Sequence, residues 1–314
     1  MKKLLISILV LICGLSLVGC SKEKSSSVQE PQKTLTIGVM PDVESIPLII
    51  AEKNGYFTKA GVKVKIEHFT SAKDRDSALQ SGKLDGVVTD VLAVVFANEG
   101  GIDLKMIAKT NGNIELMAGK DSGIHSINDL KGKSVGMSTN TVMEYTTDQM
   151  LAAAQIKAKE INKIAIPPLP TRLEMLQGGK IDAAILPEPL AGLAVKDGAR
   201  VLSSTDQLGN KAGAIAFSGR SLQESSQEIK AVFSAYNEAV KYLQKEPLSS
   251  YVDYIIQAQG FPLTIKDSLK LPPYNLAEAP DTKIVADVVK WMQAKKLIKN
   301  NYVYKDLVDE SVLR

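Results

Sequence analysis

The sequence predicts an α/β protein built from two lobes of similar design. Residues 78–90 read ALQSGKLDGVVTD and residues 175–189 read MLQGGKIDAAILPEP, and matching positions such as Leu79 and Leu176 lie 97 residues apart. Each stretch combines the end of an amphipathic helix, a glycine suited to the left-handed conformation and a short apolar strand. The strands end at polar or proline-rich corners, where ligands tend to bind in α/β units, so we expect a cleft between the lobes.

A second pair of apolar strands precedes these stretches. Residues 37–40 read IGVM and residues 135–138 read VGMS, at an offset of 98 residues, and each is followed by a polar loop and a helical pattern. One LxxGxxD pattern alone is a common helix-to-strand turn. Its repetition in matching surroundings favours two related lobes.

Strands and helices alternate through the first lobe. Strands are expected near Thr34–Met40, Val62–Phe69, Leu84–Val88, Leu104–Lys109 and Ile114–Ala118, and helices near Pro47–Lys53, Asp74–Gln80 and Val91–Asn98. This alternation predicts a mainly parallel sheet covered by helices on both faces.

The second lobe repeats the alternation, and a helical region follows it. Strands are expected near Ser134–Met137, Lys163–Ile166 and Ile181–Leu186, helices near Met143–Ala154, Thr171–Gln177 and Glu188–Val195, a returning strand over Ala212–Ser218, and further helices over Gln227–Gln244, Leu248–Ala258 and Thr282–Leu297. Trp291 lies in an apolar stripe and is expected to pack rather than to contact ligand. We assign residues 34–118 and about 214–314 to lobe 1 and residues 119–213 to lobe 2, with a hinge between them and a helical C-terminal extension.

The first 33 residues are expected to target the chain rather than to fold with it. Residues 1–19 carry two lysines and then an apolar run too short for a comfortable membrane span, as in a secretory signal peptide. The run ends in LVGC, which resembles the bacterial lipobox and predicts acylation of Cys20, with palmitate for example. Residues 21–33 are polar and predict a flexible tether. The protein is therefore expected outside the cytoplasm, anchored by lipid to the bacterial membrane; an ordinary signal peptide with a chance cysteine is the alternative.

Composition excludes several classes of function. The other cysteine, Cys13, lies in the signal segment, so the mature chain offers no disulfide, thiol nucleophile or cysteine-based metal site. Removing Lys2 and Lys3 from the 38 basic residues leaves 36 against 35 acidic ones, without the basic clusters that nucleic-acid binding requires. His68 and His125 have no evident catalytic partners. We expect no cofactor, no metal and no catalysis.

Several motifs in order resemble one family of proteins. They are the lipobox, IGV at 37–39, PLIIAEKNGYF at 47–57, GKLDG at 82–86, DLKGKSVG at 129–136, GKIDA at 179–183 and PEP at 187–189. Together they resemble substrate-binding lipoproteins of ABC importers, in the group that binds nitrate, sulfonates, taurine or the pyrimidine precursor of thiamine. The resemblance implies a two-lobed periplasmic-binding-protein fold of type II that closes on a small molecule. It also implies an ABC permease and its ATPase as partners, and a monomer.

The same resemblance implies ligand contacts in the loops that follow the strands. The positions are Asp42, Glu44, Ser45, Thr89, Asp90, Ser138, Thr139, Asn140, Thr141, Glu144 and Glu188. Each group has a plainer interpretation. Residues 138–141 would also serve as a helix cap, Glu144 would favour the helix dipole, and Asp42 and Glu44 would also suit a solvated loop.

The acidic character of these positions bears on the ligand. Asp42, Glu44, Asp90, Glu144 and Glu188 would line the cleft with carboxylates and no arginine, which disfavours an anion. A ligand rich in N–H donors, such as an aminopyrimidine, or a cation is therefore expected, with sulfonate, taurine or nitrate as the alternative. Arg172 would revive the anion interpretation if it faced the cleft, but we expect it to be solvated. A pyrimidine-pathway enzyme and a sensor module are the competing classes.

Overall fold

The computed structural model describes residues 33–314. The expected signal segment, Cys20 and nearly all of the tether lie outside the described residues. Within residues 33–314, no helix combines the length and the apolar character needed to cross a bilayer.

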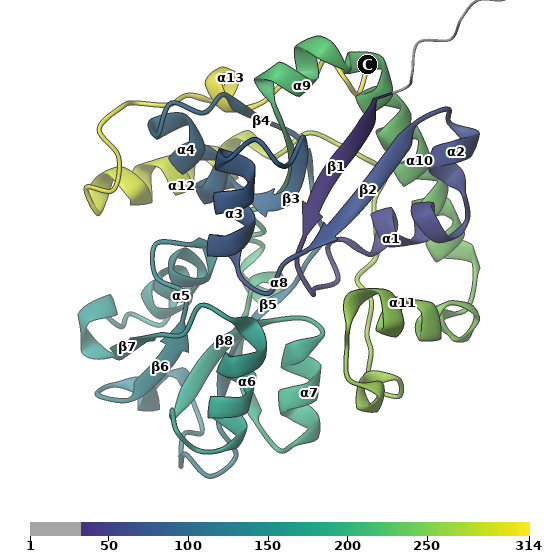
Figure 1. The fold of residues 1–314 in the computed structure, drawn as a ribbon. Helices are drawn as coiled ribbons and strands as arrows, with labels where there is room; N and C mark the ends of the chain where they lie inside the picture. Colours follow the sequence, from purple (N-terminus) through teal and green to yellow (C-terminus); the bar gives the residue numbers. More distant parts are fainter. Residues whose placement is uncertain (1–32) are drawn as a thin grey trace, which may run out of the picture. The chain divides into compact units, whose positions relative to one another are not determined.

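Two mixed sheets of five strands form the framework (Figure 1). The first sheet has the order β2-β1-β3-β10-β4. Its strands are β1 (Thr34–Val39), β2 (Lys63–His68), β3 (Gly86–Asp90), β4 (Leu104–Lys109) and β10 (Gly213–Ser218). β1 is parallel to β2 and β3, whereas β10 is antiparallel to both β3 and β4. The sheet is therefore mainly parallel, as expected, and β10 is its one antiparallel strand, which returns from the other lobe.

The second sheet has the order β7-β6-β8-β5-β9 and the same pattern of directions. Its strands are β5 (Ile114–Ala118), β6 (Ser134–Met137), β7 (Asn162–Ala165), β8 (Ala183–Pro187) and β9 (Arg200–Ser204). β6 is parallel to β7 and β8, and β5 runs antiparallel to β8 and β9. The strand β9 was not predicted from the sequence; three of its five residues, Arg200, Val201 and Leu202, are not buried, so it lacks a strong apolar signal.

The placement of β5 corrects the expected lobe boundary. Residues 114–118 were assigned to lobe 1, but β5 hydrogen-bonds with β8 and β9 in the second sheet. The first crossing between sheets therefore lies at residues 110–113, and the second precedes β10. Each lobe receives its antiparallel strand from one of these crossings. A short buried strand does not reveal by its own sequence which sheet it joins.

Helices cover the faces of both sheets. In the first lobe they are α1 (Ile46–Lys53), α2 (Tyr56–Lys59), α3 (Ala72–Gln80) and α4 (Val91–Glu99). In the second they are α5 (Val142–Ala153), α6 (Leu169–Gln177), α7 (Leu190–Lys196) and α8 (Thr205–Leu208). Four of these helices begin with a side-chain cap at or after the end of a strand, from Ser71, Asp90, Thr141 and Ser204. A cap accepts a hydrogen bond from an otherwise unpaired backbone N–H of the first turn.

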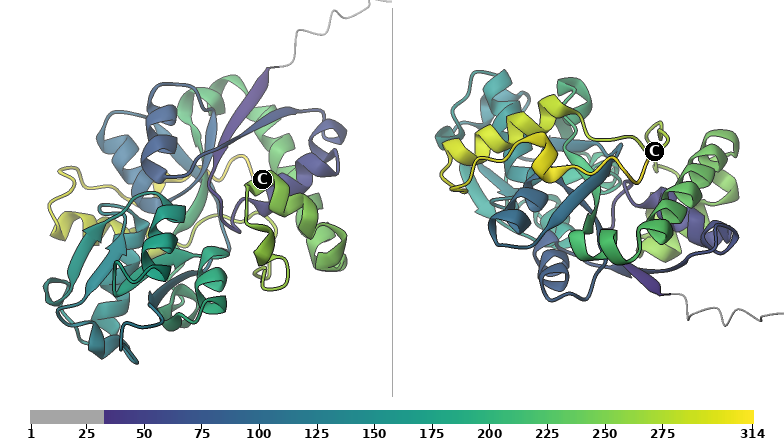
Figure 2. Two further views of the ribbon diagram at one scale, coloured as in Figure 1. Left: turned by 60° about the horizontal axis from the view of Figure 1, so that its bottom comes forward. Right: turned by 90° about the horizontal axis from the view of Figure 1, so that it is seen from above.

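The C-terminal helices pack mainly on the first lobe. They are α9 (Gly219–Glu224), α10 (Ser226–Lys245), α11 (Val252–Gln259), α12 (Thr282–Ala294) and α13 (Tyr304–Leu307). Alternate residues of β10 separate two cores: Ile215 and Phe217 belong to one with residues of α1 and α10, and Ala214 and Ala216 to the other with residues of α4 and α12. Figures 1 and 2 show α10 and α12 on different sides of this sheet. Trp291 packs edge-on against Tyr145, with ring centroids 5.6 Å apart, as expected of a packing residue.

The repeated stretches build the same joint in each lobe. Gly82 and Gly179 both adopt the left-handed conformation predicted for them, with φ of +72° and +63°. Gly38 in β1 and Gly136 in β6 leave no room for a side chain, because a Cβ would lie 2.7 Å from Leu84 and 2.5 Å from Ile181 respectively. The repeat therefore specifies how a helix and two strands pack together in each lobe.

Candidate ligand-binding site

A cavity lies between the two sheets, at the ends of their strands. The space between atoms in this cavity has a volume of about 630 Å³, which includes open solvent at its mouth. Its lining residues are Met40, Asp42, Glu44, Ala72, Arg75, Val88, Thr89, Asp90, Ile114, Ser138, Thr141, Val142, Met143, Pro167, Leu169, Pro187 and Gly213. The lining thus combines an apolar wall from both lobes with a small set of polar groups. Concave sites of this composition are typical of small-molecule binding.

Three carboxylates reach the cavity from lobe 1. Asp42 and Glu44 lie in the loop after β1, where Asp42 Oδ1 accepts a hydrogen bond from the Glu44 backbone N–H at 3.0 Å. Glu44 Oε1 accepts a short hydrogen bond from the Thr110 hydroxyl. Asp90 is the last residue of β3 and caps α4, accepting from the Ala93 N–H at 3.0 Å. Backbone turns and a helix cap therefore fix the orientation of all three groups.

Burial makes these carboxylates reluctant to ionise. It raises the pKa of Asp42, and the neighbouring charge of Glu44 adds to the rise. Burial also raises the pKa of Glu44, against the hydrogen bond from Thr110. For Asp90, burial raises the pKa to about 6, although Arg75 acts in the opposite direction. A ligand that supplies N–H donors or positive charge would favour the ionised carboxylates.

Arg75, which the sequence reasoning missed, is the cationic group of the lining. Its side chain is 3% exposed and its Nη1 donates to the Val88 carbonyl oxygen at 3.0 Å. Its Nη2 lies 2.8 Å from Asp76 Oδ1, but it makes no hydrogen bond of acceptable geometry within residues 33–314. The repeat contained the signal that could have found it, because Arg75 and Arg172 are separated by the same 97 residues.

Arg172 is fully buried, which corrects the expectation that it is solvated. Its Nη1 donates to the Ile185 carbonyl oxygen at 2.8 Å, and its Nε and Nη2 donate to the Ile166 carbonyl oxygen. Nη2 also donates to Ser138 Oγ at 2.5 Å. Burial lowers the pKa of Arg172 to about 9, so it remains charged at neutral pH. Its donors are used within the lobe, so Arg172 reaches the cavity only through Ser138.

Ser138 and Thr141 line the cavity from lobe 2. Thr141 Oγ1 accepts from the Met143 N–H at 3.2 Å and so caps α5, while its hydroxyl donates to the Ser138 carbonyl oxygen at 2.9 Å. Thr141 therefore both caps α5 and lines the cavity, so the two interpretations of this residue hold together. Thr139 and Asn140, between them, are exposed and are not in the lining.

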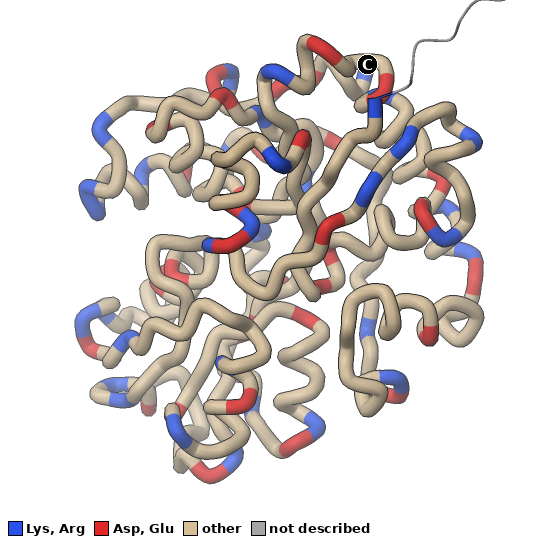
Figure 3. The backbone as a smooth tube through the Cα atoms, viewed as in Figure 1, with Lys and Arg blue, Asp and Glu red and all other residues tan. Residues whose placement is uncertain are grey.

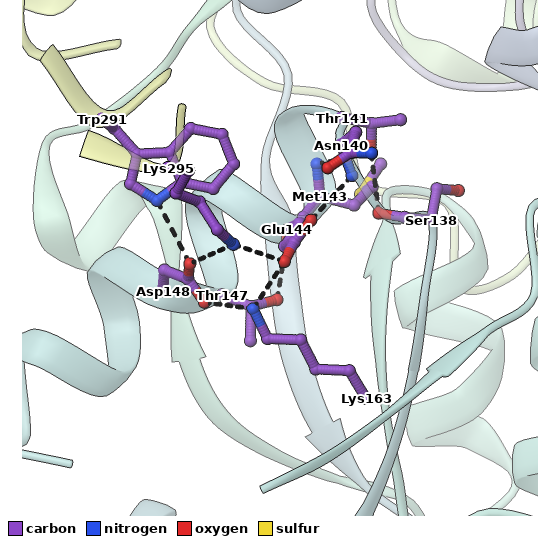
Figure 4. Close-up of polar contacts among 10 residues, drawn as sticks. All are labelled: Ser138, Asn140, Thr141, Met143, Glu144, Thr147, Asp148, Lys163, Trp291 and Lys295. Atoms are coloured by element: carbon purple, nitrogen blue, oxygen red, sulfur yellow. Dashed lines mark hydrogen bonds and ion pairs between the residues drawn. The ribbon is translucent and has the colours of Figure 1, made fainter. Parts of the chain in front are cut away.

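Three further expected residues lie outside the lining. Ser45 is fully buried and accepts a hydrogen bond from Gln259 Nε2 at 2.6 Å. Glu188 accepts from the Gly192 N–H at 3.0 Å, and burial raises its pKa. Glu144 is directed away from the cavity into an ion-pair network (Figure 4). For these three, position after a strand or in a first helical turn did not determine where the side chain points.

The network around Glu144 connects α5 to the C-terminal helix α12. Glu144 Oε1 accepts from Lys163 Nζ at 2.7 Å and from Lys295 Nζ at 2.6 Å, and Asp148 contacts both lysines (Figure 4). Burial by itself would raise the pKa of Glu144, but the hydrogen bonds from the two lysines outweigh it and hold that pKa at about 2. Trp291 Nε1 also donates to Asp148 Oδ2, at 3.1 Å. Because α12 packs on α4 of the first lobe, these contacts bridge the lobes.

Backbone contacts also join the lobes close to the cavity. The Val43 N–H donates to the Glu188 carbonyl oxygen at 3.2 Å, and the Leu169 N–H donates to the Thr70 carbonyl oxygen at 3.4 Å. The structure therefore represents an arrangement in which the lobes are in contact around the lining. Within residues 33–314, no cluster of three or more His, Cys, Asp or Glu side chains is arranged to hold a metal ion.

Comparison with known proteins identifies the family. A family model described as NMT1/THI5 like matches residues 42–250. The chain belongs to the NMT1/THI5-like family. A Brachyspira hyodysenteriae protein, whose name assigns it to the ABC transporter periplasmic binding proteins, is 26% identical over 261 residues, covering 78% of this chain and 75% of that protein. A Bacillus subtilis protein assigned to aliphatic sulfonate binding is 25% identical over 328 residues, covering 100% of this chain and 96% of its own.

Solved structures share the fold of this NMT1/THI5-like protein. The alkanesulfonate-binding protein SsuA from Xanthomonas axonopodis pv. citri, bound to MOPS, aligns with a TM-score of 0.76 at 18% identity, covering 89% of this chain and 99% of that one. The desulfurization enzyme DSZB aligns with a TM-score of 0.64 at 12% identity, covering 90% and 98%. The expected two-lobed periplasmic-binding-protein fold is thereby confirmed, and an enzyme also uses it.

Proposed function

We propose that this protein is the extracytoplasmic solute-binding component of an ABC importer. In this role it captures a small polar molecule between its lobes and delivers it to a permease driven by an ATPase. The observation that carries the proposal is the cavity between two sheets, lined by buried polar groups from both lobes and surrounded by contacts between them. The family match and the two curated relatives support the same role. Lobe closure on a ligand then needs no chemistry, only contacts made in the closed form.

The preferred ligand in this proposal carries N–H donors or positive charge, as an aminopyrimidine or a cationic compound does. Asp42 and Asp90 are each 6% exposed, and with Glu44 they offer acceptors that a donor-rich ligand would pair. Within residues 33–314, Arg75 is the cation that lines the cavity beside them. Bringing a simple anion next to three carboxylates would cost electrostatic energy.

A sulfonate, taurine or nitrate remains the second candidate. Arg75 favours it, because it is a cationic residue of the lining whose Nη2 contacts Asp76 but makes no hydrogen bond of acceptable geometry among the described residues. The relative assigned to aliphatic sulfonate binding supports it as well. Arg172 does not favour an anionic ligand, since its donors are hydrogen-bonded inside lobe 2.

We further propose that Cys20 carries the lipid anchor and that residues 21–33 tether a monomeric binding unit to the membrane. The LVGC sequence and the polar composition after it support this. Basic and acidic positions are interspersed in Figure 3, which favours neither a nucleic-acid partner nor a charged membrane-binding face. Labelling cells with an alkyne-bearing palmitate analogue should mark the wild type and not Cys20→Ala. Labelling of both would contradict the anchor.

Thermal unfolding of the Ser21–Arg314 fragment against small molecules tests the binding function. The panel contains aminopyrimidines, polyamine-like cations, sulfonates, taurine and nitrate. A ligand present at a hundred times its dissociation constant should stabilise the fold by about 2.7 kcal/mol and raise the midpoint by several degrees. A shift with aminopyrimidines or cations that is lost in Asp90→Ala supports the preferred ligand. A shift with sulfonates or nitrate alone contradicts it.

A further inference from the structure

The two buried arginines occupy equivalent places and differ in the surroundings of Nε and Nη2. Arg75 Nε donates to Asp76 Oδ1 at 2.9 Å, whereas Arg172 Nε donates to the Ile166 carbonyl oxygen at 3.0 Å. Arg75 Nη1 donates to Val88 and Arg172 Nη1 donates to Ile185, and both donors and acceptors are separated by 97 residues. Arg172 Nη2 is hydrogen-bonded within lobe 2, to Ser138 Oγ among others. Arg75 Nη2 makes only its ion-pair contact with Asp76. Lobe 1 therefore carries a buried donor that its own fold pairs only through the contact with Asp76, without a hydrogen bond of acceptable geometry.

Thr89 is a second unused polar group at the same place. It is 4% exposed, lines the cavity, and its Oγ1 has no hydrogen-bond partner within residues 33–314. It follows Val88, the residue whose carbonyl oxygen holds Arg75. Buried polar groups are rarely left unpaired, because each costs free energy unless something else pairs it. Two such groups on neighbouring residues of one cavity point to a ligand.

The carboxylates belong to the same lining and, although burial raises their pKa values, lie close enough to Arg75 for its charge to lower the pKa values of Asp42, Glu44 and Asp90. Asp90 is oriented by its capping bond to Ala93, and Glu44 by its bond from Thr110. These side chains present acceptors only, whereas Arg75 presents donors and Thr89 can do either. Apolar residues including Val88, Ile114 and Leu169 complete the wall. A cation alone would leave Arg75 Nη2 with only its contact to Asp76 and would be repelled by the guanidinium, and an anion alone would be repelled by the carboxylates.

We infer that the ligand is bifunctional, with an oxygen acceptor bound by Arg75 and Thr89 and an amino, ammonium or amidine group bound by Asp90 and Glu44. A short apolar body would join the two ends. This inference rests on the proposed function and names the ligand class of its site. It makes Arg75 and Thr89 specificity-determining residues; Thr89 was already an expected ligand contact, whereas Arg75 was not expected from the sequence. The acceptor can be a carboxylate, a sulfonate or a carbonyl oxygen.

Matched sets of compounds test the inference and distinguish these acceptors. The first set is butanoate, butylamine and 4-aminobutyrate, the second is propanesulfonate, propylamine and 3-aminopropanesulfonate, and the third is 4-aminopyrimidine and its 2-oxo derivative. In thermal unfolding and calorimetric titration, at least one bifunctional compound should bind at least about tenfold more tightly than its monofunctional counterparts. The set that does so identifies the acceptor.

Variants then separate ligand contact from structural support. Arg75→Lys should weaken binding of that compound by roughly tenfold or more, and Thr89→Val by roughly fivefold, while Thr89→Ser should restore binding. Without ligand, Thr89→Val should raise the thermal midpoint by about 2 °C, because it removes an unpaired buried hydroxyl. Thr147→Val is the matched control: Thr147 is buried outside the lining and donates to the Met143 carbonyl oxygen at 2.8 Å, so binding should not change.

The outcomes separate this inference from the proposed function. Tight binding of a monofunctional cation or anion, with no gain from the second group, would overturn the inference and leave the solute-binding role standing. The same follows if the bifunctional compound binds wild type, Arg75→Lys and Thr89→Val equally. If no compound of the panel shifts the midpoint, both the inference and the proposed function fail for these ligand classes.

Discussion

Lobe 1 and lobe 2 place the same arginine at the same point of the same repeat, yet only one of them uses all its donors internally. Arg172 donates to the Ile166 and Ile185 carbonyl oxygens and to Ser138, whereas Arg75 donates to Val88 and Asp76 and leaves Nη2 without a hydrogen bond of acceptable geometry. The acidic groups of the two lobes also differ, in their pKa values. Asp90 of lobe 1 has a pKa of about 6 in the cavity, and Glu144 of lobe 2 has one of about 2 in an ion-pair network.

The difference shows that a repeated framework does not imply repeated function. Lobe 2 pairs its buried charges within the protein, so they stabilise the fold. Lobe 1 keeps buried charges under-paired, a state that costs stability and is typical of functional sites. The following predictions test this contrast between internally paired and under-paired groups, from the largest expected effect to the smallest.

Replacing each buried arginine with methionine should give the largest difference in stability between the two lobes. Arg172→Met leaves the carbonyl oxygens of Ile166 and Ile185 buried without their donor, and should cost about 3–5 kcal/mol of unfolding free energy. Arg75→Met loses one such bond and the pairing with the partly exposed Asp76, and should cost about 1–2 kcal/mol. Urea unfolding without ligand measures both. Equal costs would contradict the proposed division between the lobes.

Glu144→Gln should cost about 2 kcal/mol at neutral pH, since Asp148 still partners Lys163 and Lys295. The folded-state pKa of Glu144 is about 2, below its ordinary value of 4.5. Its contribution is therefore fully present above about pH 4.5 and is lost as the pH falls through about 2. The stability gap between wild type and Glu144→Gln should shrink across that window. A gap that stays constant down to pH 2 would mean that ionisation of Glu144 does not stabilise the fold.

Asp90→Asn should stabilise the unliganded fold, whereas Glu144→Gln should destabilise it. The pKa of Asp90 is raised from 3.8 to about 6, so ionisation is disfavoured in the fold. The resulting destabilisation is absent below about pH 3.8, grows as the pH rises, and is complete above about 6. Asparagine keeps the helix cap without the charge, so the unliganded variant should be about 1–2 kcal/mol more stable at pH 8 and equal to wild type at pH 3.5. Thermal unfolding at the two pH values checks this, and destabilisation at pH 8 would refute it.

The smallest effects on stability are expected where both lobes make the same hydrogen bond at the same position of the repeat. Asp85 Oδ2 accepts from the Thr36 N–H at 2.9 Å, and Asp182 Oδ2 accepts from the Ser134 N–H at 2.8 Å. Asp85→Ala and Asp182→Ala should each cost about 1 kcal/mol. Paired urea titrations should give values within about 0.5 kcal/mol of each other. A large difference would show that the lobes also diverge in their framework.

Much of the fold could be predicted from the sequence because its signals are local. The strands β4, β5 and β6 have the predicted bounds, and the glycines after α3 and α6 adopt the predicted conformation. The site was predicted in part: Asp42, Glu44, Thr89, Asp90, Ser138 and Thr141 line the cavity, whereas Ser45, Thr139, Asn140, Glu144 and Glu188 do not. Loop position indicates which residues come near a cleft. The direction of each side chain depends on partners elsewhere.

Glu144 illustrates why the remainder was not predictable. From the sequence it is an acidic residue in a first helical turn after a polar loop, as a ligand contact would be. Its orientation is set by Lys163 and by Lys295, which is 151 residues away in the chain. Arg75 was missed for the converse reason, because an arginine in a polar helix start looks solvated until β3 is packed against it.

The sequence by itself determined the two-lobed α/β design, the repeated helix-turn-strand joint, the longer helices and every strand but β9, since periodicity, caps and glycine conformation act over a few residues. The tertiary structure alone decided that β5 joins the second sheet, that Arg172 and Glu144 are paired within the protein, and that Arg75 and Thr89 are left for the cavity. The physical reason is that pairing of buried polar groups depends on residues brought together from distant parts of the chain.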